Sequence, residues 1–189
     1  MSSQLLFPVE GLLTERLIVR PVRVSDAAAT LEFAIRNRAH LAPWEPMRTD
    51  DFYALPAAQA RVAMSVVQMN DGQALHLLLL SRETGDVVGT CNFSNVIRGA
   101  FQACHLGFSI GAAAQGQGLM YEGARLAIEE LFSRYDLHRI MANHRPENLR
   151  SARLLERLGF EREGFARSYL KINGEWTDHV LTSLINPGH

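Results

Sequence analysis

Cysteine is scarce in this chain, which contains only Cys91 and Cys104 among its 189 residues. Two thiols cannot form a disulfide framework or supply the four ligands of a structural zinc site, which excludes disulfide-stapled scaffolds and zinc modules. We therefore expect no bound metal. We also expect both thiols to be reduced, as is usual in the cytoplasm.

Long apolar runs are also missing. The longest, Leu77–Leu80, is far shorter than the roughly 20 apolar residues that cross a membrane. The first eight residues contain neither a basic segment nor an extended apolar stretch, so we expect no signal peptide there. These absences predict a cytoplasmic protein that has no membrane partner.

Basic charge is not in excess, because 19 Lys and Arg residues face 20 Asp and Glu residues. A net charge of -1 argues against a general nucleic-acid binder, which normally concentrates positive charge on one face. Neither a repeat nor a Ser/Gly linker marks a boundary along the chain. We therefore expect one domain over residues 1–189, with its core at about 14–185.

Seven extended segments alternate with helical ones, which predicts the α/β (α+β) class, with a mixed twisted sheet of about seven strands and helices on both faces. The predicted strands are Leu17–Val22, Ala74–Ser81, Val87–Ile97, Phe101–Ile110, His138–Asn143, Phe160–Ile172 and Trp176–Ile185. The predicted helices are one opened by Ser25 and Asp26, and those over Ala57–Met69, Gln117–Ser133 and Pro146–Leu158.

Two local expectations concern the N-terminal third. The helix that begins after Ser25 and Asp26 has Leu31, Ala34 and Ile35 on its predicted apolar face. The segment Leu41–Pro46 contains two prolines, each of which pushes the preceding residue toward extended backbone. We expect that segment to be irregular.

A glycine-rich junction lies where the strand ending at Ile110 leads into the next helix. Gly116 and Gly118 precede that helix, whose first N–H groups lack intrahelical acceptors and carry partial positive charge. Without Cβ atoms, the two glycines let a phosphate approach the backbone closely. The pattern suits a diphosphate ligand, and the alternative is a tight turn that leads into an ordinary helix.

Two common phosphate motifs are absent at this junction. A P-loop requires Gly-x-x-x-x-Gly-Lys-Ser/Thr, which the chain lacks. The dinucleotide fingerprint requires a third glycine where this chain has Tyr121.

A second motif, Asn148-x-x-Ser151, lies at the start of the next predicted helix. Residues three apart share one helix face, so both side chains can serve one site. The alternative is that Asn148 caps the helix and Ser151 faces solvent.

These motifs resemble the GCN5-related N-acetyltransferases (GNAT). Gln115-Gly116-Gln117-Gly118-Leu119 matches the Gln/Arg-x-x-Gly-x-Gly/Ala motif of that family, and Asn148-x-x-Ser151 followed by Leu158-Gly159-Phe160 matches its usual fourth helix. The resemblance is nearest to the ribosomal-protein-alanine branch, of the RimJ and RimL kind and closest to RimJ. It covers nearly the whole chain, from Thr14 to about Leu184. Met120, where Gly or Ala is common in the superfamily, also follows that branch.

The resemblance implies acetyl-coenzyme A as the donor and no metal. Asn148 would bind the amide of the pantetheine arm, beside Ser151. The arm would run along a strand splayed from the His138–Asn143 strand. The residues expected to hold the coenzyme are Phe108, Ser109, Ile110, Gln115, Gly116, Gln117, Gly118, Leu119, Met120, Asn143, Asn148 and Ser151.

The expected reaction is direct attack of an amine on the thioester. An α-amine has a pKa of about 7.7–8.0 and a lysine about 10.4, so about a tenth of α-amines are neutral near pH 7. By position in the family pattern, Ser151 is the candidate acid for the thiolate. Glu45 is the candidate group that binds or deprotonates the amine, and Trp44 is the candidate cover of the acceptor's first residue. A solvated loop glutamate and a core tryptophan are the alternatives.

The acceptor implied by the resemblance is the N-terminal alanine of the fifth protein of the small ribosomal subunit, with the ribosome or its assembly intermediates as further candidate partners. Two alternatives stay open: an acetyltransferase for a small amine such as a polyamine, aminoglycoside or amino acid, and a non-catalytic acyl-coenzyme A binding or ribosome-assembly module. A peptide acceptor requires an open groove between the Pro43–Pro46 loop and the Asn173–Gly174 turn. A polyamine favours a closed acidic pocket.

Overall fold

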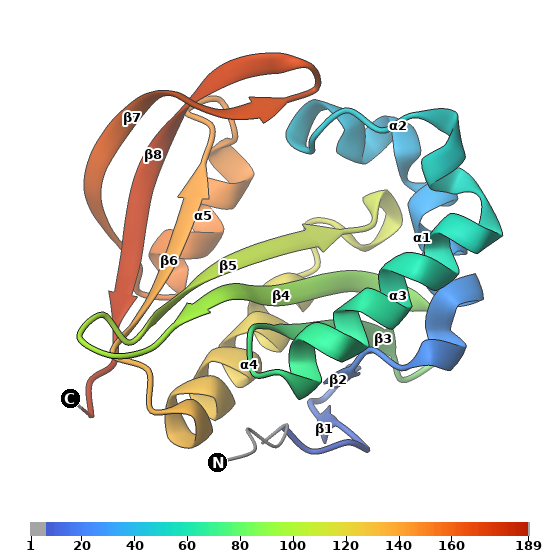
Figure 1. The fold of residues 1–189 in the computed structure, drawn as a ribbon, viewed down its shortest axis with the longest axis horizontal. Coiled ribbons are helices and arrows are strands. Elements are labelled where there is room, and N and C mark those ends of the chain that lie inside the picture. Colours follow the sequence, from blue (N-terminus) through green and yellow to red (C-terminus); the bar gives the residue numbers. More distant parts are fainter. Residues whose placement is uncertain (1–6, 189) are drawn as a thin grey trace.

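The structure is a computed structural model, and it describes residues 7–188 (Figure 1). Most of the segment examined above for a signal peptide lies outside these residues. None of the described helices is long and apolar enough to cross a membrane.

One mixed sheet of eight strands organises the chain, in the order β1-β2-β3-β4-β5-β6-β8-β7. Among the described strands, only β5 and β6 pair in parallel. The eighth strand, absent from the prediction, is the two-residue β1 at the edge of the sheet. The strands are β1 (Leu12–Leu13), β2 (Leu17–Pro21), β3 (Leu75–Ser81), β4 (Val87–Ile97), β5 (Ala103–Ile110), β6 (Arg139–His144), β7 (Glu161–Ile172) and β8 (Glu175–Ile185).

Helices cover both faces of the sheet, as predicted. In Figure 1, α1 (Ala27–Arg36) and α2 (Arg38–Leu41) lie at the right, and α3 (Leu55–Asn70) lies in front of the central strands. Behind them lie α4 (Leu119–Tyr135) and α5 (Leu149–Arg157). Short 3₁₀ turns complete the described elements: η1 (Val24–Asp26), η2 (Ala42–Trp44), η3 (Asp50–Tyr53) and η4 (Ala112–Ala114).

The core between the sheet and α4 confirms the predicted apolar stripe of this helix. All six predicted residues are buried: Leu119, Met120, Ala124, Ala127, Ile128 and Leu131. Gly123 lets the helix approach the sheet, because a Cβ there would lie 2.6 Å from Leu79 Cδ2. The opposite face of the central strands is more polar, and it borders the site described below.

Three local expectations were wrong. Ile35 is 54% exposed, because α1 buries Phe33, which lies on nearly the opposite side of the helix from Ile35. The Leu41–Pro46 segment contains the 3₁₀ turn η2, where Pro43 sits in the first turn and its missing N–H costs nothing. α5 begins at Leu149 rather than Pro146, because Asn148 caps it.

β5 and β6 diverge soon after they meet. They pair only at Ala103–Arg139, Cys104–Ile140 and His105–Met141, and from Leu106 onward β5 runs beside β4 alone (Figure 1). The expected splay between these strands is therefore confirmed. It leaves one backbone edge of β5 without a neighbouring strand at the centre of the molecule.

Candidate active site

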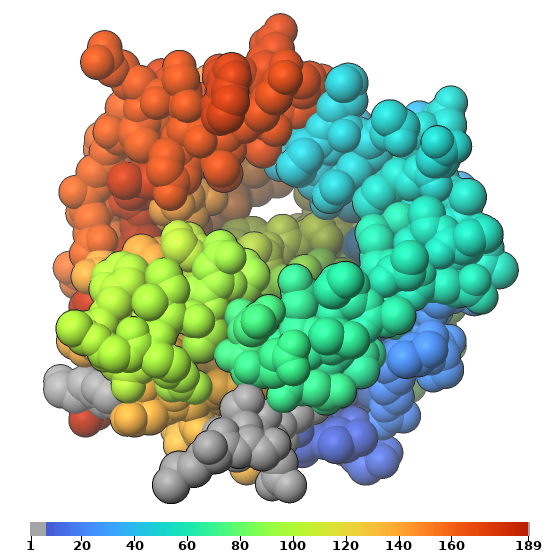
Figure 2. All heavy atoms as spheres, in the orientation of Figure 1, coloured from blue at the N-terminus to red at the C-terminus, as the bar shows by residue number. Residues whose placement is uncertain are grey.

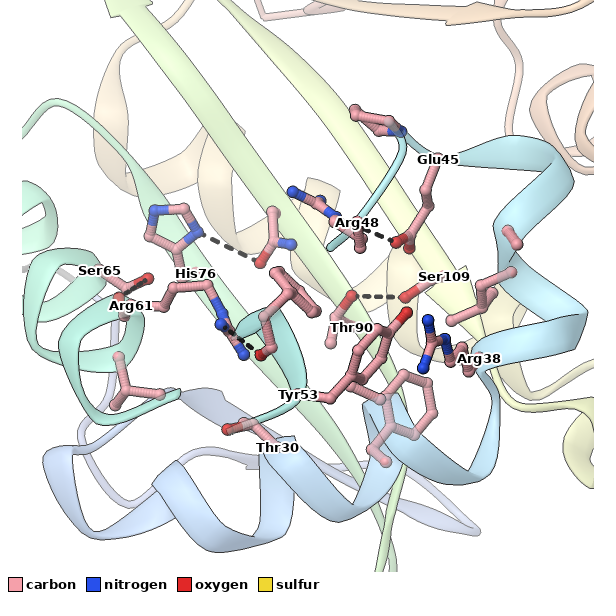
Figure 3. A pocket seen from close by; sticks show the side chains of 18 of the residues that line it. Thr30, Arg38, Glu45, Arg48, Tyr53, Arg61, Ser65, His76, Thr90 and Ser109 are labelled. Carbon is pink, nitrogen blue, oxygen red and sulfur yellow. Dashed lines mark hydrogen bonds and ion pairs between the residues drawn. The ribbon is translucent and has the colours of Figure 1, made fainter. Parts of the chain in front are cut away.

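A cavity of about 560 Å³ lies on the face of the sheet covered by α1 and α3 (Figure 3). Its floor is polar because alternate residues of neighbouring strands point the same way: His76 on β3, Thr90 and Asn92 on β4, and Ser109 on β5. The hydroxyls of Thr90 and Ser109 lie 2.9 Å apart. The alternation of polar and apolar residues along 87–97 was the sequence signal for this floor.

The His76 ring is held rigidly in this floor. Its Nδ1 lies 3.3 Å from Asn92 Oδ1 and its Nε2 lies 2.9 Å from Gln68 Oε1. Burial lowers the pKa of His76 despite the opposing effect of the Asn92 hydrogen bond, so the ring is neutral near pH 7.

The segment after η2 forms the opposite wall and is tied to two distant parts of the chain. The Arg145 side chain donates to the carbonyl oxygen of Pro43 at 2.9 Å. The backbone N–H of Asn173 donates to the carbonyl oxygen of Glu45, also at 2.9 Å. These contacts bring the segment against the β7–β8 turn and the β6–α5 loop. A peptide acceptor would need an open groove between Pro43–Pro46 and the Asn173–Gly174 turn, and the Asn173–Glu45 hydrogen bond bridges the two at that point.

An opening nevertheless passes through the molecule beneath this bridge. Figure 2 shows it between the β7–β8 hairpin, the cyan segment near residue 45 and the green strands of the sheet. It lies at the splay of β5 and β6. A long, narrow ligand can therefore reach the edge of β5 from one side and the cavity from the other.

Glu45 directs its carboxylate into the cavity (Figure 3). Its side chain is 34% exposed, and its Oε2 lies 4.0 Å from Nε of Arg48. Burial raises the pKa of Glu45 more than the nearby Arg48 lowers it, so the pKa lies above its usual value. A carboxylate with a raised pKa accepts a proton more readily, which suits a group that takes a proton from an amine.

Three arginines line the same cavity, and each lies over an aromatic ring. Arg38 is 4.3 Å from the centre of the Tyr53 ring, and Arg48 is 4.5 Å from that of Phe52. Arg61 approaches the Phe52 ring from α3 at 3.7 Å. Glu45 is the one acid among the lining residues, so arginines outnumber acids in the cavity by three to one.

The edge of β5 offers backbone groups to the opening. The N–H of Gly111 donates to the carbonyl oxygen of Val88 on β4. The carbonyl oxygen of Ser109 also faces β4, because a Cβ placed on Gly89 would lie 2.6 Å from it. Because backbone groups alternate along a strand, those of Phe108 and Ile110 point the other way, toward the splay. An extended amide chain can pair there as an added strand would.

The glycine junction has the backbone that the sequence predicted. Gly116 and Gly118 adopt left-handed φ angles of 74° and 78°. A Cβ on Gly116 would meet nothing within 4 Å, so that position faces open space. Among the described residues, the N–H groups of Gln117 to Met120 donate to no protein acceptor, and no side chain caps α4. This helix start is therefore free to bind an anion.

A family model described as an acetyltransferase (GNAT) domain matches residues 16–161. The chain belongs to this family. It is an acyltransferase that takes its acetyl group from acetyl-coenzyme A. The resemblance inferred from the glycine and Asn148–Ser151 motifs is confirmed.

Three relatives cover most of this acetyltransferase. It is 46% identical over 181 residues to the [Ribosomal protein uS5]-alanine N-acetyltransferase of Escherichia coli, covering 95% of this chain and 93% of the relative. The ribosomal-protein-S5-alanine acetyltransferase of Vibrio fischeri shares 38% identity and a TM-score of 0.89, covering 93% and 96%. Mycobacterium smegmatis RimJ, solved in complex with CoA-disulfide, shares 30% identity and a TM-score of 0.84, covering 89% and 81%.

Two arginines that the sequence did not single out flank the acetyltransferase's glycine junction. Arg16 donates to the Gln117 carbonyl at 2.9 Å and pairs with Glu122, which neutralises the acid in the first turn of α4. Arg150 donates to Oε1 of Gln115 from the first turn of α5. Both lie far from the junction in sequence, so no local pattern revealed them.

The structure brings Asn148 and Ser151 together at the start of α5, but it places neither in the lining of the cavity. Asn148 Oδ1 accepts the Ser151 N–H at 3.1 Å, so the capping alternative for Asn148 is confirmed. The Ser151 hydroxyl makes no hydrogen bond to another described residue and can donate its proton elsewhere. Nearby, Asn143 Nδ2 donates to the Tyr169 hydroxyl at 3.4 Å.

Trp44 is 39% exposed, so it does not fill the core. Arg145 lies 5.8 Å from the centre of its ring, and Trp44 flanks Glu45 at the surface. Its role as cover for an acceptor residue stays a prediction.

An acyl-thioester on the protein is disfavoured in this acetyltransferase. Cys91 and Cys104 are buried strand residues, and burial raises the pKa of each thiol to about 12. The thiolate is the nucleophilic form of cysteine, and it is scarce near pH 7 at such a pKa. Among the described residues, no group of three or more His, Cys, Asp or Glu side chains could hold a metal.

Proposed function

We propose that this acetyltransferase modifies the α-amine of the N-terminal alanine of ribosomal protein uS5, in the cytoplasm. Two relatives named for that acceptor, from E. coli and V. fischeri, support the proposal through their 46% and 38% identity over nearly the full chain. Binding to the ribosome or its assembly intermediates stays a prediction.

The observation that carries the acceptor class is the charge of the cavity. Three arginines and one glutamate line it, which is unfavourable for a polyamine or an aminoglycoside with several positive charges. A polyamine favours a closed acidic pocket, and arginines outnumber acids among the residues that line this cavity. A peptide N-terminus carries a single amine, and the half-buried Glu45 is matched to that one group.

Glu45 also argues against a non-catalytic module. A half-buried carboxylate with a raised pKa that faces a cavity is an arrangement typical of reaction sites rather than of structural surfaces. A module that only bound acyl-coenzyme A would have no use for such a group on the cavity side of the β5 edge.

The chain's own residues suffice to hold the donor. The free N–H groups from Gln117 to Met120 would bind the diphosphate, and the outward backbone of Phe108 and Ile110 would pair with the pantetheine arm. Asn148 and Asn143 would contact the arm from the other side of the splay, with Ser109 facing the cavity. Acetyl-coenzyme A supplies an activated acyl group as a thioester.

The proposed transfer of the acetyl group to the amine requires three contributions from the protein. Glu45 orients the amine and takes its proton, directly or through a water. An outward N–H on the β5 edge, near Phe108, polarises the acyl carbonyl as an oxyanion donor. Ser151 gives a proton to the leaving thiolate and takes one back from solvent.

The direct test of the acceptor is a panel incubated with acetyl-coenzyme A and followed by mass spectrometry. We expect acetylation of the α-amine of an Ala-initiated peptide, slower transfer to a peptide with a bulky first residue, and no modification of an internal lysine at pH 7. The lysine is spared because its pKa of about 10.4 leaves under a thousandth of it neutral. Comparable rates on spermidine, with an inert alanine peptide, would reverse the assignment.

Glu45→Gln should lower kcat/KM for the alanine peptide about tenfold, which corresponds to one hydrogen bond to a charged group. The same variant should bind coenzyme A with unchanged affinity in calorimetry. In the parent enzyme kcat/KM should rise with pH through the raised pKa of Glu45, because only the carboxylate accepts a proton. The variant should lose that step and keep the dependence set by the amine.

Glu129→Gln is the matched control, because Glu129 is an ion-paired surface glutamate on α4. It should leave both kcat/KM and the pH profile as they are in the parent. If the pH dependence of kcat/KM were unchanged in Glu45→Gln, Glu45 would not be the group that takes the proton.

A further inference from the structure

Arg61 differs from the other two arginines of the cavity in its partners. Arg38 pairs with Asp50 at 2.7 Å, and Arg48 lies 4.0 Å from Glu45. Among the described residues, no carboxylate lies within 4.0 Å of Arg61. Arg61 is partly buried at the cavity wall, and its guanidinium donates to the Phe52 carbonyl at 2.8 Å and lies over the Phe52 ring.

A half-buried cation without an acid is unusual, because a charge removed from water is normally paired. Burial and the positive charge of Arg48 lower the pKa of Arg61 more than Tyr53 raises it, so its surroundings disfavour the charged form. The Phe52 carbonyl satisfies only part of a guanidinium that has five N–H donors. The remaining donors and the uncompensated charge are available to a ligand in the cavity.

The position of Arg61 relates this charge to the acceptor. In Figure 3, Arg61 and His76 lie on one side of the cavity, while Glu45 and Ser109 lie on the other, with Thr90 between them. An α-amine held near Glu45 therefore leaves room for following residues to extend toward Arg61. The cavity volume of about 560 Å³ is in the range of sites that hold ligands much larger than one alanine.

We propose that Arg61 selects the acceptor by binding an acidic side chain that lies a few residues after the acetylated one. This inference rests on the proposed function, since it requires a peptide in the cavity. Arg48, which already faces Glu45, adds to the positive potential. A guanidinium binds a carboxylate through two parallel hydrogen bonds, so the side chain would be recognised by geometry as well as by charge.

The test uses Ala-initiated peptides with Gln at positions 2 to 5, in which a single Glu is moved through these positions. We expect Glu at one position to lower the KM of the parent enzyme about tenfold relative to the all-Gln peptide, with little change in kcat. In Arg61→Gln that preference should vanish, while the KM for the all-Gln peptide and for acetyl-coenzyme A stays within about twofold. Arg61→Lys should restore part of the preference.

Two further variants separate recognition from folding. Arg61→Glu should prefer a Lys over a Glu at the same peptide position, a reversal that loss of structure cannot produce. Arg125→Gln, on the opposite side of the sheet in α4, should behave as the parent. Equal KM values for all peptides in the parent, or a preference that survives in Arg61→Gln, would overturn the inference while leaving alanine acetylation intact.

The proposed function fails in a different way. If no Ala-initiated peptide is acetylated, that function is wrong and the inference about Arg61 is wrong with it. Free glutamate and free alanine are included for that reason. Their acetylation, dependent on Arg61 and without any peptide product, would assign the arginine to the carboxylate of a free amino acid.

Discussion

Replacing Ser151 with alanine is expected to lower kcat by about 10²–10⁴-fold, the usual contribution of a general acid. The KM for acetyl-coenzyme A should change much less, because a proton is needed by the leaving thiolate only as the bond breaks. Steady-state kinetics with an Ala-initiated peptide, at saturating acetyl-coenzyme A, measures both values.

Replacing Ser151 with alanine should remove the hydroxyl without disturbing the start of α5. Asn148 caps α5 through the backbone N–H of Ser151, which alanine keeps, so the helix start is preserved. The Ser151 hydroxyl makes no hydrogen bond to another described residue, and its removal leaves no buried partner unsatisfied. Thermal unfolding of Ser151→Ala should therefore match that of the parent.

A loss of less than about threefold would reduce Ser151 to a residue of the helix start. Tyr169→Phe should be measured beside it, because the Tyr169 hydroxyl, which accepts from Asn143, is a second hydroxyl near this end of β6. If the large loss in kcat followed Tyr169→Phe and not Ser151→Ala, the proton donor would be the tyrosine.

Gly116→Asp is expected to weaken coenzyme A binding about 100-fold in calorimetry. The new side chain would point into open space beside the free N–H groups of α4, where the diphosphate is expected. Like charges brought together in a binding site cost several kcal/mol, and each 1.4 kcal/mol is about tenfold in affinity.

The control for backbone strain is Gly85→Asp. Gly85 has a φ of 77° against 74° for Gly116, and a Cβ on either would meet nothing within 4 Å. Both substitutions therefore carry the same cost of placing an L-residue in the left-handed region, about 1–2 kcal/mol. Both variants should unfold at similar temperatures, and only Gly116→Asp should lose affinity. Equal coenzyme A affinity in the two variants would show that the diphosphate does not bind at this loop.

Much of the fold could be predicted from the sequence because its signals are local. The apolar stripe of α4 follows from a period of 3.6 residues, and the β7–β8 hairpin from the Asn173–Gly174 turn, whose residues have φ angles of 46° and 87°. The donor side of the site could be predicted from the sequence for the same reason. The glycine junction and the α5 cap each lie within a few consecutive residues.

The acceptor side of the site could be predicted from the sequence only in part. Glu45 and Trp44 were candidates because two prolines mark their segment, but the contacts that place that segment come from Arg145 and Asn173, more than 100 residues away. One of those contacts bridges the place where a peptide acceptor would need an open groove, and the sequence could not show this. Ile35 was misplaced because a helix face is chosen by what packs against it, and Phe33 offered a competing stripe.

What the sequence by itself determined is therefore the main strands and helices, though not β1 or α2, together with their order and the two junctions that a coenzyme diphosphate and a helix cap require. Only the tertiary structure decided that β5 and β6 part after three pairs, and that Glu45, Ser109 and Arg61 line one cavity. The physical reason is the range of the interactions. Helical periods and turns act over a few residues, whereas a cavity is enclosed by faces of elements that meet only when the whole chain packs.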